Sequence, residues 1–200
     1  IWLTTLTPIG EGDEVSYIVG SSMDITERKK LETKSIKYAN YDKLTGLPNR
    51  RLFFERLEQM VLENERAKNR FALLFIDLDG FKDINDNYGH EVGDEVLITV
   101  GNRLAECIRK SDTVARMGGD EFTIIIRKDE SKKAINDIVK KIHATLKIAM
   151  HIGEIKCTVN SSIGVAIYPD NGKDSEALLR NADSTMYRVK KDGKGGFKFT

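Results

Sequence analysis

Two adjacent glycines, Gly118 and Gly119, separate two short apolar runs and restrict the local fold more than any other feature of this chain. The runs, residues 114–117 and 122–126, each have the length of a β-strand. A Gly-Gly connection is typical of a β-hairpin, because hairpin turns need positive φ angles that glycine adopts readily. The sequence therefore predicts a hairpin, with the carboxylates of Asp120 and Glu121 directly after its turn.

A second apolar run, residues 71–76, ends in two further carboxylates, Asp77 and Asp79. Because the run is apolar on both faces, it predicts a central strand that is covered on both sides. A fold that brings its end to the hairpin would gather several acids at one edge of a sheet. Such acids repel one another unless a cation neutralises them, and oxygen ligands suit a hard divalent ion such as Mg²⁺. The pattern points to phosphate chemistry.

Helical and strand periodicities alternate along the rest of the chain from residue 42 onwards. The expected helices are residues 50–68, 81–87, 92–108, 131–148 and 175–191, and the further expected strands are residues 155–159, 162–167 and 196–199. This order predicts an α+β fold with a central, mainly antiparallel sheet that is flanked by helices.

The first 41 residues differ in character from the rest. Residues 1–25 contain two β-prone runs on either side of a turn at residues 10–13. Since two strands alone are marginal in water, we expect them to belong to a larger sheet. Residues 26–41 predict a charged helix, capped by Asp24 or Thr26, with a thin apolar stripe. The stripe suits either pairing with a copy of itself or a solvated linker helix, and the sequence leaves both open.

The composition restricts the partners and the compartment. Lys and Arg number 32 against 31 Asp and Glu, and this balance argues against non-specific binding to nucleic acid or membranes. Cys107 and Cys157 match no metal or redox spacing, so reduced thiols in the cytoplasm are expected. No apolar run could cross a bilayer and no signal peptide is visible. Because Ile1 is not an initiator methionine, we interpret the chain as part of a longer protein that can be membrane-tethered elsewhere.

Separated segments, in order along the chain, resemble the GGDEF family of diguanylate cyclases. They are Asp42-Lys-Leu-Thr-Gly-Leu-Pro-Asn-Arg50, Asp77-Leu-Asp-Gly-Phe-Lys-Asp-Ile-Asn-Asp86, Gly89-His-Glu-Val-Gly-Asp94, Arg116-Met-Gly-Gly-Asp-Glu-Phe122 and Ala182-Asp-Ser-Thr-Met-Tyr187. The resemblance covers residues 42–200 and implies a GGDEF catalytic domain with the ferredoxin-like palm fold of nucleotidyl cyclases. Residues 1–25 look like the C-terminal end of a PAS sensory domain, and residues 26–41 look like its signalling linker helix.

The resemblance also implies a reaction and its metal. Members of the family join two GTP molecules into cyclic di-GMP and release two pyrophosphates, as a homodimer in which each protomer brings one GTP. The implied ligands of Mg²⁺ (or Mn²⁺) are Asp77, Asp120 and the backbone carbonyl of Leu78. Asp120 is also the position that is often proposed as general base, with Glu121 facing the site and Lys82 countering negative charge in the transition state.

The residues that the resemblance implies for GTP binding are Phe81, Asn85, His90, Asp94, Lys190 and Lys194. Asn85 and Asp94 would read the guanine edge, although Asp94 alone could equally serve as a helix cap. Lys194-Gly195 departs from the family, which usually has Arg followed by Asn. Lysine keeps the charge and loses the bidentate fork of arginine, so weaker GTP binding is expected.

Arg109 and Asp112 stand at the spacing of the family's inhibitory site for cyclic di-GMP. Away from that context they would be read as a surface ion pair. The intact acids favour an active diguanylate cyclase, whereas the Lys194 departure leaves open a weakly catalytic module that binds GTP or cyclic di-GMP and regulates a neighbouring domain.

Overall fold

The computed structural model describes residues 1–11, 14–127 and 131–200, in two compact units, Ile1–Ala39 and Asn40–Thr200. In the smaller unit, β1 (Trp2–Glu11) pairs antiparallel with β2 (Glu14–Asp24), and α1 (Thr26–Asn40) follows. Asp24 caps the helix by accepting hydrogen bonds from the backbone N–H and the hydroxyl of Thr26, at 2.8 and 2.6 Å. The predicted turn at residues 10–13 lies partly outside the described residues.

The β1–β2 hairpin leaves large apolar side chains in solvent. Trp2, Leu6, Ile18 and Met23 are all more than 60% exposed, so the described side chains of this pair of strands form no core. An isolated hairpin of this kind is marginally stable in water, so its membership of a larger sheet stays a prediction.

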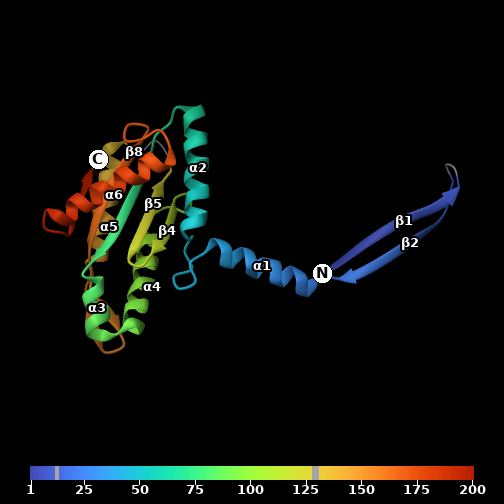
Figure 1. Cartoon of the computed structure of the whole chain (residues 1–200), viewed down its shortest axis with the longest axis horizontal. Helices are drawn as coiled ribbons and strands as arrows, with labels where there is room; N and C mark the ends of the chain where they lie inside the picture. The colour runs from blue at the N-terminus through green and yellow to red at the C-terminus, as the bar shows by residue number, and fades with distance from the viewer. Residues whose placement is uncertain (12–13, 128–130) are drawn as a thin grey trace. The chain divides into compact units, whose positions relative to one another are not determined.

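The larger unit is built on a five-stranded sheet with the order β4-β5-β3-β8-β9 (Figure 1). The strands are β3 (Phe71–Asp79), β4 (Thr113–Gly118), β5 (Glu121–Ile126), β8 (Asn160–Tyr168) and β9 (Gly196–Phe199). Every neighbouring pair is antiparallel except β8 with β9, which is parallel. The predicted α+β fold with a mainly antiparallel sheet is confirmed.

Helices cover both faces of this sheet. One core contains side chains from α3 (Phe81–Tyr88), α4 (His90–Cys107) and α5 (Lys132–Leu146), and the other from α2 (Arg50–Ala67) and α6 (Ser175–Lys191). Alternate residues of β3 enter the two cores: Leu74 and Ile76 the first, Leu73 and Phe75 the second. The central position predicted for this strand is therefore confirmed.

The region before β8 differs from the sequence prediction. A small hairpin, β6 (Met150–Ile152) with β7 (Ile155–Cys157), replaces the single strand expected at residues 155–159. Strands of three residues are at the lower limit of strand length, so periodicity hardly reveals them. Cys107 and Cys157 are free and buried, as expected for thiols of a reduced core.

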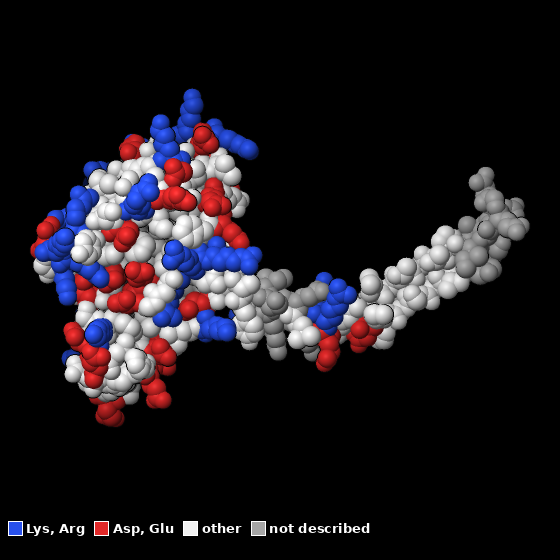
Figure 2. Space-filling view, in the orientation of Figure 1, with Lys and Arg blue, Asp and Glu red and all other residues white. Residues whose placement is uncertain are grey.

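The surface carries charges of both signs. On the face of the larger unit in Figure 2, blue basic and red acidic side chains are interspersed, in keeping with a formal net charge of +1. Among the described residues, no helix has the length and apolar character that crossing a membrane requires.

Gly164 lets α6 approach the backbone of β8. A Cβ atom at this position would lie 2.0 Å from the carbonyl oxygen of Ala182 and 2.4 Å from the backbone nitrogen of Met186. Since both obstacles are helix backbone, no side-chain movement can relieve them. Glycine at this position therefore sets the height of α6 above the sheet.

We expect Gly164→Ala to lower the free energy of unfolding by about 3 kcal/mol, the upper end of the usual range for overpacked cores. Urea denaturation followed by circular dichroism measures this change. Gly196→Ala is the matched control, because a Cβ there would meet only Val189 Cγ1 at 3.7 Å, an ordinary contact. Equal effects of the two substitutions would contradict the close approach of α6.

Candidate active site

Asp77 lies inside the central strand, whereas the sequence predicted that the strand ends at Ile76. The strand β3 continues to Asp79, and Asp77 pairs in register with Glu121 on β5 and with Ser162 on β8. Residues in direct register have side chains on the same face, here the face of α2 and α6. Only 5% of Asp77 is exposed, so a carboxylate is buried within the sheet.

The hairpin turn brings Asp120 to the same place. Its turn residues are Gly119 and Asp120 rather than the predicted Gly118 and Gly119, because Gly118 pairs with Glu121 after an irregularity in β4. Both glycines have positive φ, 145° and 52°, as the hairpin prediction required. Leu78 of β3 donates its backbone N–H to the carbonyl oxygen of Asp120 at 3.3 Å. The predicted convergence of the two acidic segments is thus present.

These acids perturb one another. Burial raises the pKa of Asp77, Lys190 opposes that rise, and the neighbouring Asp120 and Asp79 add to it. Burial also raises the pKa of Glu121, with Asp77, Asp183 and Asp120 as further causes. A raised pKa in the folded state means that ionisation of these groups weakens folding as the pH rises through that pKa. A bound cation would relieve this cost.

The residues present fit a divalent cation. Asp77 Oδ1 is buried, and among the described residues it forms an ion pair with Lys190, whose Nζ lies 2.6 Å away. In the described part of the chain, no three His, Cys, Asp or Glu side chains cluster as metal ligands. The predicted set needs only two carboxylates, since its third ligand is the Leu78 carbonyl. A buried carboxylate oxygen beside a second acid has the chemistry that Mg²⁺ selects.

Asp79 has a structural role that the sequence did not suggest. Ser162 donates its hydroxyl to both carboxylate oxygens, at 2.9 and 3.0 Å, and Gly195 donates its backbone N–H to Oδ2 at 2.9 Å. This contact fixes the loop that carries Lys194, whose side chain is exposed and whose φ is +63°. The one feature of the sequence that could have indicated this role of Asp79 is the alternation Asp77-Leu78-Asp79, because it places both acids on one face of a strand.

The residues expected to bind the base lie on α3 and at the start of α4. Asn85 is half-buried, and a Cβ at Gly93 would lie 1.9 Å from its Oδ1, so glycine at position 93 makes room for this amide. Asp94 follows directly and lines a cleft of about 570 Å³ together with Leu44. Lys82 and His90 are exposed, whereas Phe81 is buried in the core.

Arg109 and Asp112 lie between α4 and β4. The carboxylate of Asp112 accepts the backbone N–H of Arg109 at 3.1 Å and that of Arg127 at 3.0 Å. Asp112 also lines a cavity of about 350 Å³ with the basic side chains of Arg56, Lys110 and Arg127. The aspartate therefore holds the local backbone, and three basic side chains line the adjacent cavity together with Glu63, which pairs with Arg127.

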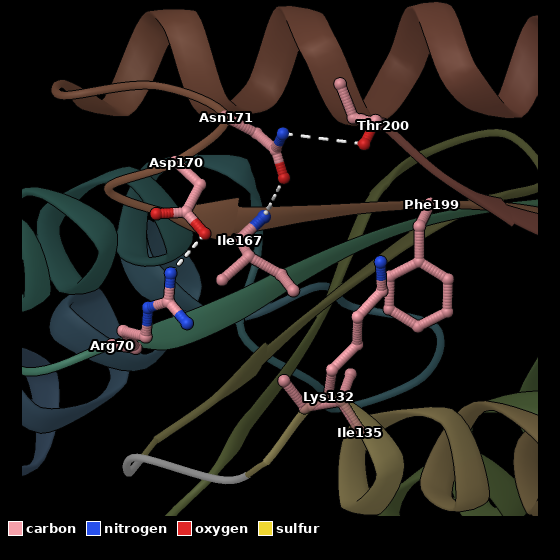
Figure 3. A pocket seen from close by; sticks show the side chains of 8 residues that line it. All are labelled: Arg70, Lys132, Ile135, Ile167, Asp170, Asn171, Phe199 and Thr200. Atoms are coloured by element: carbon pink, nitrogen blue, oxygen red, sulfur yellow. Dashed lines mark hydrogen bonds and ion pairs between the residues drawn. The ribbon is translucent and has the colours of Figure 1, made fainter.

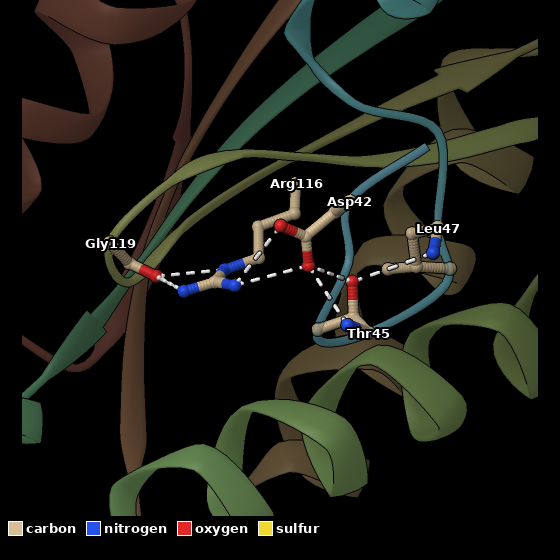
Figure 4. Close-up of polar contacts among 5 residues, drawn as sticks. All are labelled: Asp42, Thr45, Leu47, Arg116 and Gly119. Atoms are coloured by element: carbon tan, nitrogen blue, oxygen red, sulfur yellow. Dashed lines mark hydrogen bonds and ion pairs between the residues drawn. The ribbon is translucent and has the colours of Figure 1, made fainter. Parts of the chain in front are cut away.

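An ion pair ties the segment that follows α1 to the hairpin turn (Figure 4). The Arg116 guanidinium contacts both oxygens of Asp42, at 3.1 and 3.3 Å, and donates to the carbonyl oxygen of Gly119 at 2.8 and 3.0 Å. Asp42 Oδ1 also accepts the N–H and hydroxyl of Thr45, at 2.9 and 2.7 Å. Burial raises the pKa of Asp42, but the hydrogen bonds from Thr45 and Arg116 outweigh it and hold that pKa below its ordinary value.

A separate cavity of about 240 Å³ lies at the opposite end of β3 (Figure 3). Arg70, just before the strand, is paired there with Asp170, which follows β8, and Lys132 lies over the Phe199 ring at 5.5 Å. Arg70 and Asp170 are engaged with each other and Lys132 with the Phe199 ring, and the acids at the other end of β3 lie away from this cavity.

Comparison with known proteins gives one consistent result. The sequence model described as diguanylate cyclase, GGDEF domain, matches residues 39–196. Over 182 residues, 90% of this chain, the sequence is 41% identical to the bifunctional diguanylate cyclase/cyclic di-GMP phosphodiesterase MucR of Pseudomonas aeruginosa. The chain spans 26% of the length of that relative.

Solved structures agree with the sequence matches. The GGDEF domain of TpbB from Pseudomonas aeruginosa superimposes with a TM-score of 0.77 and 36% identity, over 80% of this chain and 93% of that one. The GGDEF domain of DgcB from Caulobacter crescentus, solved in complex with c-di-GMP, gives a TM-score of 0.74 and 25% identity over 80% and 95% of the two chains.

The Asp42–Arg116 pair predicts a pH-dependent contribution to stability. Because the pKa of Asp42 is lowered by folding, its stabilisation is complete above the unfolded value of about 3.9 and is lost as the pH falls through the folded pKa. We expect Asp42→Asn to destabilise the protein by about 1.5–3 kcal/mol at pH 7, the range for hydrogen bonds to charged groups. Urea unfolding at a series of pH values should show this difference shrinking as the pH falls below the unfolded value.

Glu63→Gln is the control for that measurement. It breaks a similar pair with Arg127, but both partners are more than 40% exposed, so a loss below about 1 kcal/mol is expected. A destabilisation by Asp42→Asn that does not depend on pH would show that the charge of Asp42 is not its source.

Proposed function

The chain belongs to the GGDEF family of diguanylate cyclases, and we propose that it condenses two GTP molecules into cyclic di-GMP with release of two pyrophosphates. In each half-reaction a 3′-hydroxyl oxygen bonds to the α-phosphorus of the other GTP, the bond from that phosphorus to the bridging oxygen breaks, and the hydroxyl proton leaves to a base. The observation that carries the proposal is the convergence of Asp77, Asp120 and Glu121 where β3 meets the hairpin.

Mg²⁺ (or Mn²⁺) would be held by Asp77, Asp120 and the Leu78 carbonyl, and when bound it supplies positive charge to phosphate oxygens and to the attacking oxygen. The burial of the Asp77 carboxylate next to the turn that carries Asp120 supports this assignment. Asp120 remains the proposed base, with Glu121 beside it.

Basic groups of the chain would bind the triphosphate. Lys190 is already at the acids, and Lys194 lies on the loop that Asp79 fixes. The first N–H groups of α3, from Phe81 and Lys82, provide donors at a helix N-terminus, where anions bind favourably. Lys82 is exposed and can turn towards developing negative charge.

Asn85, Asp94 and His90 would recognise the guanine. An aspartate accepts from the N1–H and the exocyclic amine, and asparagine meets the remaining edge, so adenine would leave these groups unpaired. The space that Gly93 leaves for the Asn85 amide supports a shaped pocket at this place.

We further propose that the active form is a homodimer in the cytoplasm, because each half-reaction needs a second, opposed GTP. The exposed apolar side chains of β1 and β2 support their assignment to the end of a PAS domain, with residues 26–41 as its linker to residues 42–200. The charged α1 would then be the segment through which a sensory input reaches the catalytic domain.

The test is incubation of the purified protein with Mg²⁺ and GTP, with nucleotides separated by chromatography. We expect cyclic di-GMP and pyrophosphate in a ratio of about 1:2, as the balanced reaction requires. Asp77→Asn should reduce the rate at least about 100-fold, equivalent to about 2.7 kcal/mol of barrier. It should still fold, because burial already disfavours the charge at this position.

Asp170→Asn is the matched control, since it neutralises an exposed acid at the far end of β3 and should leave the rate unchanged. GTP binding without any product at high protein concentration would overturn the cyclase proposal. That outcome would favour the second candidate, a module that binds GTP or cyclic di-GMP and regulates a neighbouring domain, which the Lys194 departure supports.

We also propose that Arg109 and Asp112 form a product-inhibition site for cyclic di-GMP. The basic side chains around the adjacent cavity suit the phosphates of that ligand. Arg109 is the residue to change, because loss of Asp112 would also release two backbone N–H groups.

We expect Arg109→Ala to raise the concentration of cyclic di-GMP that halves the initial rate by at least about tenfold, equivalent to about 1.4 kcal/mol. Initial rates with added product measure this shift. Arg51→Ala, which removes the same charge from an exposed pair with Glu55, should leave the inhibition unchanged. Unaltered inhibition in the Arg109 variant would refute the site.

A further inference from the structure

Lys190 supplies the positive charge nearest to the buried acid of β3. Its Nζ lies 2.6 Å from Asp77 Oδ1, and the two side chains are 30% and 8% exposed. Burial and the neighbouring acids raise the pKa of Glu121, and the same ammonium opposes that rise, so one lysine acts on two acids. Within the described part of the chain, Asp77 Oδ1 has no hydrogen-bond partner apart from this contact.

We propose that Lys190 is a resident counter-ion of Asp77 that a divalent cation must displace, so that this side chain couples metal binding to nucleotide binding. The inference rests on the proposed function, because it takes Asp77 as a ligand of the divalent cation. Its new content is the competition between the lysine and the metal for one oxygen.

The competition follows from the geometry. An ammonium 2.6 Å from a carboxylate oxygen occupies the approach to that oxygen, and a cation bound there would repel it in this poorly solvated place. The site contains Asp77, Asp120 and Glu121 against one lysine, so a charge of +2 neutralises it better than a charge of +1. The metal therefore gains by binding, but it first has to break the ion pair.

The displaced lysine needs another anionic partner. Lys190 lies in the last turn of α6 on a flexible four-carbon stem, so its ammonium can move while the helix stays in place. The triphosphate of GTP offers oxygens close to the same acids. Once nucleotide is bound, Lys190 moves to phosphate and Asp77 is free to bind metal, so each ligand strengthens the binding of the other.

The experiment measures Mn²⁺ binding by electron paramagnetic resonance in the absence of nucleotide, for the wild-type chain and for Lys190→Met. We expect the variant to bind Mn²⁺ at least fivefold more tightly, the lower end of the usual coupling range of about 5- to 150-fold. The variant should also bind 3′-deoxy-GTP, which lacks the attacking hydroxyl, more weakly when no metal is present. A general structural defect would weaken both. Unchanged or weaker Mn²⁺ binding by Lys190→Met would overturn the inference.

Lys191→Met is the matched control. It removes the same charge from the same helix one residue later, where the ammonium lies 4.8 Å from the centre of the exposed Tyr187 ring. We expect its Mn²⁺ affinity to equal that of the wild-type chain. An equal gain in both variants would mean that the net charge of α6 is responsible, and the specific competition would be refuted.

Two further variants keep the test decisive. If circular dichroism shows that Lys190→Met does not fold, Lys190→Gln takes its place. The glutamine amide can still donate a hydrogen bond to Asp77 but carries no charge. Asp77→Asn separates the two proposals. If it leaves wild-type Mn²⁺ binding intact, the proposed metal site is wrong. If it abolishes binding while the Lys190 variants equal the wild-type chain, only the competition is wrong.

Discussion

The burial of a carboxylate within the central strand is the constraint on which the larger unit depends. Asp77 stands in β3 with strands on both sides, and helices cover both faces of the sheet. A buried charge needs a partner, and α6 brings Lys190 to it. That helix can do so because Gly164 allows its backbone to lie directly against β8. The absence of a side chain at Gly164 in β8 thus allows the contact between Lys190 and the carboxylate of Asp77 in β3.

The hairpin turn is held from outside the sheet as well. Arg116 lies on β4, binds the carbonyl of Gly119 in the turn, and is itself fixed by Asp42. The backbone of Arg116 also donates to Pro48, so the whole segment 42–48 follows the edge strand. Asp42 comes only two residues after the end of α1, so the contact that holds the turn lies close to that helix in the sequence.

The sequence predicted the elements whose burial is periodic and failed where an interaction overrides propensity. The bounds of α6 and β9 agree with the prediction, because apolar spacing and flanking glycines mark their ends. The end of β3 was placed too early, since aspartate is depleted in strands, yet ladder pairing on both sides carries Asp77 and Asp79 within it. The turn was misplaced by one residue because the irregularity in β4 depends on pairing with β5. Motif spacing indicated the acids themselves. Their partners follow only from the tertiary structure: Ser162 binds Asp79, and Lys190 pairs with Asp77.

The departure at Lys194-Gly195 has a local physical explanation. Gly195 has a φ of +66°, and a Cβ there would lie 2.1 Å from Asn160 Nδ2. Asn160 is not free to move away, because its Oδ1 accepts the backbone N–H of Ser161 at 3.1 Å. A side chain such as asparagine at position 195 would therefore need a different residue or rotamer at position 160. Asp79 holds the Gly195 N–H regardless of that side chain, so the charge at position 194 keeps its place. For the phosphate contact that we propose at this position, a lysine lacks the second hydrogen bond of a bidentate arginine, so we expect the loss in the strength of phosphate binding rather than in the architecture of the loop.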